Sequence, residues 1–349
     1  TRLTGAFYDS INFEFLRPFQ LPAKQGGTKG GRQVCFSKGN GDVKYVFGPV
    51  ASRRLKRSLG IDCIPCKTCT LDCIYCEVGS TTTLTVERRE YVPCEAILDN
   101  LREYLDELVI PPDYITLGGS GEPTLHSRIG MIIQGIKALT TIPVAVLTNG
   151  SLLFQDEVKE ALLDADVVLP SLDAIREATF QAVNRPHPSL DNRAIIRGLR
   201  EFRRVFTGQI WLEVLLCQGI NDSEEEIEHL TEVVASINPD TIHLNTVDRP
   251  PAVDGVRPVA PETLSAIRER FGSTAEIVAA SFWSREKQKP VHATLRVIEL
   301  LRRRPGTVED IAHALRISRE EAATTIAGLI RDGAVHARVF EGRRYYHAE

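Results

Sequence analysis

From about residue 45, short apolar segments alternate with longer stretches in which apolar residues recur at helical spacing. The apolar segments predict six strands, at Ser58–Ile61, Tyr114–Leu117, Val144–Leu147, Val167–Leu169, Ile210–Leu216 and Thr241–Leu244. The stretches between them predict helices at about 95–109, 127–139, 155–165, 191–206 and 223–237. The last of these begins with Ser223 followed by Glu226, which is the pattern of a capping box.

Regular alternation of strands and helices predicts parallel strands joined by right-handed crossovers. We therefore expect an α/β fold, a partial (β/α)6 TIM-like barrel, with an open doubly wound sheet as the competing architecture. In a barrel of this kind the functional residues lie at the carboxyl ends of the strands and in the loops that follow.

The rest of the chain divides around this core. We predict an N-terminal extension of irregular structure (1–44), the barrel core (45–248), a proline-rich connector that includes a barrel-closing segment (249–287), and a C-terminal unit (288–349). In the connector we expect a helix near 262–271 and a strand near 275–279. In the C-terminal unit we expect helices at 291–303, from Thr307 and at 318–331, and strands at 334–340 and 343–347. Three short helices before a β-hairpin resemble a winged helix-turn-helix domain.

Composition fits an ordinary globular chain. Of the 349 residues, 43% are hydrophobic and 25% are charged, and the formal net charge is −4. No apolar run approaches the ~20 residues of a membrane-spanning helix. The net charge excludes a uniformly basic nucleic-acid-binding chain, although a local basic patch remains open. The N-terminus shows no secretion signal, so we expect a cytoplasmic protein, in which the eight cysteines need an explanation other than disulfides.

Five of those cysteines, at 63, 66, 69, 73 and 76, lie within fourteen residues. Such dense thiols suit a metal ion or an iron–sulfur cluster better than core packing. Structural zinc would use four of them, but no second Cys or His pair is evident. The first four have the spacing of a bacterial ferredoxin run, yet Ile74 stands where proline is usual, and a second run is missing.

The third interpretation uses Cys69-x3-Cys73-x-Tyr75-Cys76. This segment resembles the Cys-x3-Cys-x-aromatic-Cys signature of the radical S-adenosylmethionine (SAM) superfamily. The resemblance implies that these three thiolates bind three irons of a 4Fe-4S cluster and leave the fourth iron open. SAM would chelate that iron, and reductive cleavage would give a 5′-deoxyadenosyl radical. An open coordination position is what distinguishes a catalytic metal site from a structural one.

Further motifs of the superfamily recur downstream at predicted strand ends. Gly118-Gly-Ser-Gly-Glu-Pro-Thr124 resembles the segment that binds the SAM amino group, with Glu122 as the acceptor. Ser171-Leu-Asp-Ala174 resembles the segment that contacts the ribose and carboxylate. Each is also compatible with an ordinary strand-end turn or cap. The SAM contacts that the resemblance implies are Tyr75, Gly119, Ser120, Gly121, Glu122, Thr124, Thr148, Asn149, Ser171, Asp173 and Asn221.

Residues 47–62, the cysteine loop and residues 118–126 together look like the Fe–S oxidoreductase branch of the superfamily, which is related to wyosine-forming tRNA enzymes and molybdenum-cofactor enzymes. The resemblance covers about residues 45–250. Wyosine-forming enzymes carry a second cluster on three earlier cysteines. Here Cys35, Cys63 and Cys66 are the candidates, with different spacing, and a pair of thiols without a cluster is the alternative. Cys94 and Cys217 are expected to be buried thiols.

Two basic regions bear on the substrate. Ser52-Arg-Arg-Leu-Lys-Arg57 lies beside the cysteine loop and is either a solvated face or a clamp for an anionic substrate. Residues 291–349 hold ten arginines and eight acidic residues, a weak excess for DNA binding. The arginines that would contact phosphates are Arg302, Arg303, Arg304, Arg319, Arg331, Arg338, Arg343 and Arg344. Nucleic-acid binding, protein or peptide docking, and a lid or dimer contact remain open for this unit.

The leading hypothesis is a cytoplasmic radical SAM enzyme with one 4Fe-4S cluster, or two, that modifies a substrate and receives electrons from a donor such as flavodoxin or ferredoxin. The wyosine-enzyme resemblance favours RNA (tRNA) bound on the winged-helix domain, ahead of a peptide or a small metabolite. An iron–sulfur DNA-binding redox regulator and a ferredoxin fusion are the alternatives of other classes. No membrane association is expected.

Overall fold

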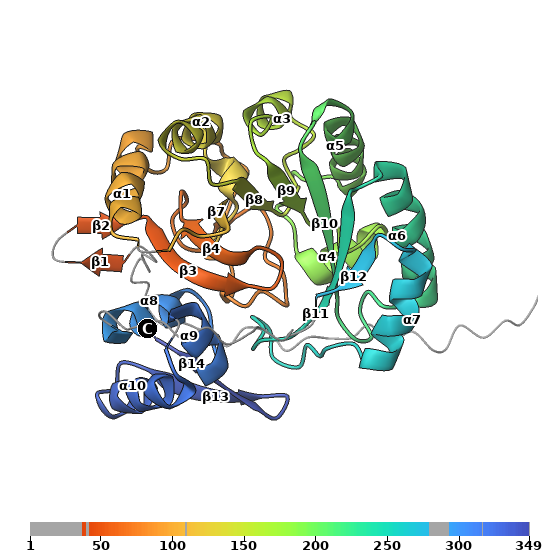
Figure 1. Ribbon diagram of the computed structural model, residues 1–349. Helices are drawn as coiled ribbons and strands as arrows, with labels where there is room; N and C mark the ends of the chain where they lie inside the picture. Colours follow the sequence, from red (N-terminus) through yellow and green to blue (C-terminus); the bar gives the residue numbers. More distant parts are fainter. Residues whose placement is uncertain (1–36, 40–41, 109, 279–292, 316, 349) are drawn as a thin grey trace, which may run out of the picture. The chain divides into compact units, whose positions relative to one another are not determined.

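The computed structural model describes residues 37–39, 42–108, 110–278, 293–315 and 317–348 (Figure 1). Its central element is an eight-stranded sheet with the order β12-β11-β10-β9-β8-β7-β4-β3. The strands are β3 (Val46–Ser52), β4 (Lys56–Ile61), β7 (Tyr114–Leu117), β8 (Val144–Thr148), β9 (Val167–Pro170), β10 (Gln209–Leu216), β11 (Thr241–Thr246) and β12 (Ala275–Ile277).

All neighbours from β4 to β12 are parallel, and only β3 runs antiparallel, against β4. The parallel strands follow one another in sequence order, whereas a doubly wound sheet reverses its order at a switch point. The expected doubly wound alternative is therefore wrong. The helices cover the outer face of the curved sheet, and its end strands β3 and β12 do not pair (Figure 1). This arrangement is consistent with the predicted partial barrel.

The six predicted strands are present, and the helices between them largely match. They are α1 (Cys94–Asp106), α2 (Ile129–Leu139), α3 (Asp156–Ala161), α4 (Glu177–Asn184), α5 (Asn192–Val205), α6 (Glu224–Ile237) and α7 (Pro261–Phe271). Helix α3 is shorter than predicted, and α4 was not predicted, because eight residues give too little periodicity to detect. Ser223 caps α6 as expected, since its side chain accepts a hydrogen bond from Glu226 N.

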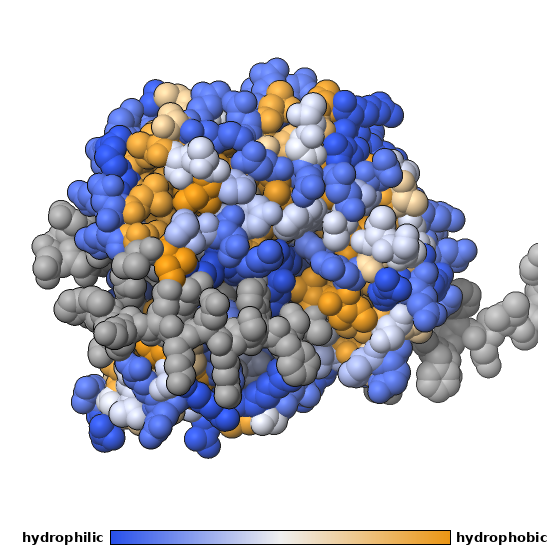
Figure 2. All heavy atoms as spheres, in the orientation of Figure 1, coloured by the Kyte–Doolittle hydropathy of each residue, from blue (hydrophilic) through white to orange (hydrophobic). Residues whose placement is uncertain are grey.

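The main core lies between the sheet and these helices. Helix α5 illustrates why the pattern folds this way: its apolar residues fall on one face, and its arginines fall on the other. Phe202 is fully buried and stacks on Phe206, with 4.7 Å between ring centroids. The surface over α5 and α6 is mainly hydrophilic (Figure 2).

The C-terminal unit consists of α8 (Ala293–Arg303), α9 (Val308–Leu315), α10 (Arg319–Arg331), β13 (His336–Phe340) and β14 (Arg343–His347). Its elements follow the predicted order, and it has a small core of its own. Both α8 and α9 contact β3 of the barrel. The winged-helix classification stays a prediction.

Three smaller points complete the fold. Strands β1 (Ser37–Gly39) and β2 (Asp42–Lys44) form an antiparallel pair where the sequence predicts irregular structure. The remainder of the predicted extension lies outside the described residues, as does 279–292. Among the described helices, not one combines the length and apolar character that crossing a membrane requires.

We expect Phe202→Ala to lower the free energy of unfolding by about 3–5 kcal/mol, because a buried ring leaves a cavity in a core that relaxes only partly. Val205→Ala on the same helix is the matched control, since Val205 is 54% exposed. Urea unfolding followed by circular dichroism measures both variants. Similar losses in the two would contradict the placement of α5.

Candidate cluster and cofactor site

The cysteine loop leaves the sheet at the carboxyl end of β4, the first parallel strand. It contains β5 (Thr68–Cys69), which pairs with β6 (Thr83–Leu84). Cys69, Cys73 and Cys76 are partly exposed, whereas Cys63 and Cys66 are buried. The loop therefore separates its five cysteines into three that a cofactor can reach and two that are buried in protein.

Each of the three accessible sulfurs accepts a hydrogen bond from a side-chain nitrogen. Lys67 Nζ lies 3.2 Å from Cys76 Sγ. Asn149 Nδ2 lies 3.6 Å from Cys69 Sγ, and Asn184 Nδ2 lies 3.4 Å from Cys73 Sγ. Donors of this kind stabilise thiolates and tune the potential of an iron–sulfur cluster.

Burial raises the pKa of the Cys69 thiol to about 12, with the nearby Glu122 adding to the shift. The pKa of Cys73 is also raised, first by burial and then by Asp173 and Cys69. Both thiols are thus protonated in the absence of metal, and binding of iron would release their protons.

The three thiols suit an iron–sulfur cluster better than a single ion. In the described part of the chain, no three His, Cys, Asp or Glu side chains gather closely enough to hold one metal ion. A cubane cluster takes its thiolates on separate irons, so its cysteines need not meet at one point. Soft sulfur ligands with N–H donors to each sulfur fit such a cluster.

The glycine-rich segment after β7 holds the cysteine loop in place. Lys67 N donates to Ser120 O at 2.7 Å, and Glu122 N donates to Thr68 O at 3.1 Å. A Cβ on Gly121 would lie 2.3 Å from Thr68 O, so only glycine permits this approach. Ser120 itself is buried and bonds Asp62 through its backbone N and its hydroxyl. Ser120, which was predicted to contact SAM, therefore helps to hold the cysteine loop in place.

Glu122 is almost fully buried, and its carboxylate joins two strand ends. Its Oε1 accepts from Thr124 N (3.0 Å), Thr124 Oγ1 (2.6 Å) and Thr148 Oγ1 (2.6 Å), while Oε2 accepts from Asn149 N at 2.7 Å. Burial raises the pKa of Glu122, although these donors favour the charged form. Thr124 and Thr148 therefore orient Glu122, and Glu122 faces the main cavity.

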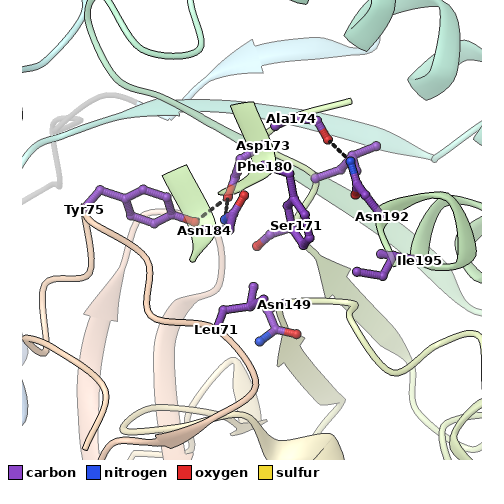
Figure 3. Close-up of a pocket in the computed structure, with 11 residues that line it drawn as sticks. Leu71, Tyr75, Asn149, Ser171, Asp173, Ala174, Phe180, Asn184, Asn192 and Ile195 are labelled. Atoms are coloured by element: carbon purple, nitrogen blue, oxygen red, sulfur yellow. Dashed lines mark hydrogen bonds between the residues drawn. The ribbon is translucent and has the colours of Figure 1, made fainter. Parts of the chain in front are cut away.

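A second polar group forms at the end of β9 (Figure 3). Asp173 Oδ2 accepts from the Tyr75 hydroxyl and from Asn184 Nδ2 at 2.8 Å, while Oδ1 accepts from Leu215 N at 2.9 Å. Burial raises the pKa of Asp173 to about 6. Asn221 is fully buried and bonds the carbonyls of Asp173 and Leu215. The cavity beside this group measures only about 20 Å³, room for a water molecule.

Asn184 is a site residue that sequence reasoning missed. It lies at the last position of α4 and bonds both the Cys73 sulfur and the Asp173 carboxylate. In the sequence, the signal for this residue was a polar side chain directly before Arg185. Arg185 follows the helix and has a left-handed backbone conformation.

Glu226 anchors the segment that carries Asp173. Its buried carboxylate accepts from Ile175 N (2.5 Å), Arg176 Nε (2.7 Å) and Thr179 Oγ1 (2.8 Å). Burial by itself would raise the pKa of Glu226, but these hydrogen bonds outweigh it, and the pKa is lowered.

The main cavity has a volume of about 330 Å³ and lies inside the barrel mouth. It brings together eight of the predicted site residues, namely Cys69, Cys76, Gly119, Gly121, Glu122, Thr148, Asn149 and Ser171. Cys73, Tyr75, Ser120, Thr124, Asp173 and Asn221 do not line it. Of the basic run, Arg54 reaches the cavity, where it pairs with Glu213. Arg53 instead pairs with Asp248 at 2.6 Å.

The arrangement of the described cysteines does not support the hypothesis of a second cluster. Cys63 packs in the main core with Cys94, and burial raises the pKa of Cys63 to about 12. Cys66 is 7% exposed, and Cys35 lies outside the described residues. Cys94 and Cys217 are buried, as expected.

We expect Gly121→Ala to displace the cysteine loop, because its Cβ would collide with the Thr68 carbonyl. The reconstituted variant should lose most of its iron and about 1–3 kcal/mol of stability. Gly328→Ala is the matched control: the nearest atom to its added Cβ lies 3.9 Å away, on Arg331. Iron content per chain and urea unfolding measure both effects. Full iron loading of Gly121→Ala would contradict the close approach of Gly121 to the Thr68 carbonyl.

We expect Glu226→Gln to destabilise the protein by about 1–3 kcal/mol at pH 7. Because the folded-state pKa lies below the unfolded value of about 4.3, the stabilisation by ionised Glu226 is present above that pH and lost as the pH falls through the folded pKa. The difference between wild type and variant should therefore shrink below pH 4. Urea titrations at pH 7 and pH 3.5 measure it, and a constant difference would argue against an ionised Glu226.

The comparisons agree with this geometry. The radical SAM superfamily model matches residues 63–231. A protein named GTPase Obg from Brachyspira hyodysenteriae is 38% identical over 304 residues, which cover 86% of this chain and 44% of that protein. A UPF0026 protein from Methanocaldococcus jannaschii is 36% identical over 230 residues, covering 66% of this chain and 71% of that protein.

The chain thus spans less than half the length of the first of these relatives. Among solved structures, a radical SAM methyltransferase from Sphaerobacter thermophilus has a TM-score of 0.50 at 16% identity, covering 63% of this chain and 65% of that one. This likeness shows a shared fold. The predicted superfamily resemblance is confirmed by the match over residues 63–231: the chain carries a radical SAM domain, and it belongs to the UPF0026 proteins.

Proposed function

We propose that the protein is a radical SAM enzyme with one 4Fe-4S cluster on Cys69, Cys73 and Cys76. When bound and reduced, the cluster would supply the electron that cleaves SAM to a 5′-deoxyadenosyl radical, which takes a hydrogen atom from the substrate. The observation that carries this proposal is the set of three accessible thiols, each with an N–H donor, at the strand edge where Glu122 faces the same cavity.

The residues around the cavity divide the work of binding SAM. Glu122 offers carboxylate oxygens to the SAM ammonium group, and the hydroxyls of Thr124 and Thr148 keep that carboxylate oriented. Asn149 donates to Cys69 and presents its backbone N to Glu122, so it couples the two groups. Asp173, whose two carboxylate oxygens accept hydrogen bonds from protein donors, acts as a positioning residue for Tyr75 and Asn184.

The C-terminal unit supports an enclosed substrate more than an RNA. Its α8 and α9 contribute Leu300, Arg303 and Ile311 to the wall of the cavity. Several of its arginines are engaged by acids of the barrel: Arg304 pairs with Glu77 and Arg338 with Asp254. Helix α10, which would enter a groove of nucleic acid, begins with the acidic Glu320 and Glu321. We therefore favour a small molecule over the RNA that the resemblance suggested, and a flavodoxin or ferredoxin as the electron source.

We expect each of the variants Cys69→Ala, Cys73→Ala and Cys76→Ala to release no 5′-deoxyadenosine. Each reconstituted variant should also lack the visible absorbance of the cluster. The measurement uses anaerobically reconstituted, dithionite-reduced protein with SAM, followed by chromatography of the nucleoside. Cys94→Ala is the matched control because Cys94 is a buried cysteine of α1 and is not one of the three accessible thiols. Full activity of Cys73→Ala, or no release by the wild type under any condition, would overturn the assignment.

A further inference from the structure

Two buried arginines in the main cavity have N–H groups without a partner. Arg303, at the end of α8, is 7% exposed and pairs through Nη1 with Asp62, and its guanidinium stacks on Phe47 at 3.6 Å from the ring centroid. Its Nη2 has no hydrogen-bond acceptor among the described residues. Arg249, which follows β11, is 9% exposed, and its Nε is likewise unpartnered within the described part of the chain.

Both arginines line the same cavity as Cys69, Cys76 and Glu122. Their other nitrogens are fixed: Arg249 Nη1 lies 2.8 Å from Glu77 and its Nη2 lies 3.7 Å from Asp310. Ion pairs therefore hold both guanidinium groups, stacking on Phe47 also holds that of Arg303, and one buried nitrogen of each arginine has no acceptor among the described residues. Buried donors in native proteins almost always find an acceptor, so two such groups on one cavity indicate a ligand with oxygen acceptors.

The positions of the two arginines in the chain separate them from the cluster cysteines and Glu122. The superfamily model matches residues 63–231, which carry the cluster cysteines and Glu122. Arg249 and Arg303 lie beyond that match, and Arg303 comes from the C-terminal unit. Recognition of a particular substrate belongs to residues outside the machinery that the superfamily shares.

We propose that the cavity binds a small substrate through an anionic oxygen group, a phosphate or a carboxylate, held by Arg303 and Arg249, with the C-terminal unit as one wall of the substrate chamber. Guanidinium groups bind such anions through paired N–H donors. The volume of about 330 Å³ is at the lower end of the range for small-molecule sites. This inference rests on the proposed function.

The SAM carboxylate is the other source of the same chemistry, and the experiment separates the two. Reconstituted, reduced protein is given SAM and the low-mass fraction of a cell extract, divided by anion exchange into retained and unretained material. We expect the retained material to stimulate 5′-deoxyadenosine release, ribonuclease to have no effect, and inorganic phosphate or pyrophosphate to compete. SAM affinity is measured separately by equilibrium dialysis.

In Arg303→Gln, the amount of retained fraction needed for half-maximal stimulation should rise about tenfold or more, with SAM affinity unchanged. For Arg303→Lys this amount should lie between those of the wild type and Arg303→Gln, because lysine keeps the positive charge but lacks the planar guanidinium group. Arg249→Gln repeats the test at the second donor if loss of the Asp62 pair unfolds the first variant. Arg331→Gln, exposed on α10, is the control and should behave as wild type.

Three results would overturn the inference. A weaker SAM affinity in the arginine variants with normal stimulation would assign the arginines to the SAM carboxylate. Stimulation by the unretained fraction would exclude an anion, and stimulation removed by ribonuclease or lost in Arg331→Gln would make the substrate an RNA. Absence of any release by the wild type would instead refute the proposed function itself.

Discussion

The buried carboxylate of Glu122 is the constraint on which the site depends. Removing a carboxylate from water is costly unless donors replace its hydration. Here two threonine hydroxyls and two backbone N–H groups do so, and they come from the ends of two neighbouring strands. Satisfying one charge therefore fixes the relative positions of those strand ends. Because Glu122 N also bonds Thr68 O, the same residue fixes the cysteine loop.

The same device is repeated at the next strand. Asp173 gathers Tyr75 from the cysteine loop, Asn184 from α4 and the backbone of β10. Its own segment is held by Glu226 from the first turn of α6. Two of the three N–H donors to the cysteine sulfurs, Asn149 and Asn184, are placed by these carboxylates. The hydrogen bonds that satisfy these two carboxylates at the strand ends therefore also position the donors to the sulfurs that would hold iron.

Much of this could be predicted, and the failures have physical causes. Strands such as β8 and β10 are apolar segments between polar turns, so their hydrophobic pattern locates them, and the consecutive order follows from short crossovers. The motif spacing correctly brought Cys69, Glu122 and Asn149 to one place. Spacing does not say which atoms are already bonded, however. Ser120 and Asn221 were expected to contact SAM, and the structure shows their polar atoms bonded to protein.

The C-terminal unit shows the limit most clearly. From the sequence, its arginines are candidate phosphate contacts, with protein docking and a lid or dimer contact equally open, because composition reports charge without direction. In the fold, Arg303 meets Asp62, a residue 241 positions away, and no local pattern encodes a pair at that separation. Arg303 and Arg304 of this unit line the main cavity, whereas its arginines at 302, 319, 331, 338, 343 and 344 are exposed. A wall of this kind lowers the exposure of the cavity to water, and charge interactions are stronger where water is excluded. The contact between Arg303 and Asp62 thus links the C-terminal unit to the strand edge that carries the cysteine loop.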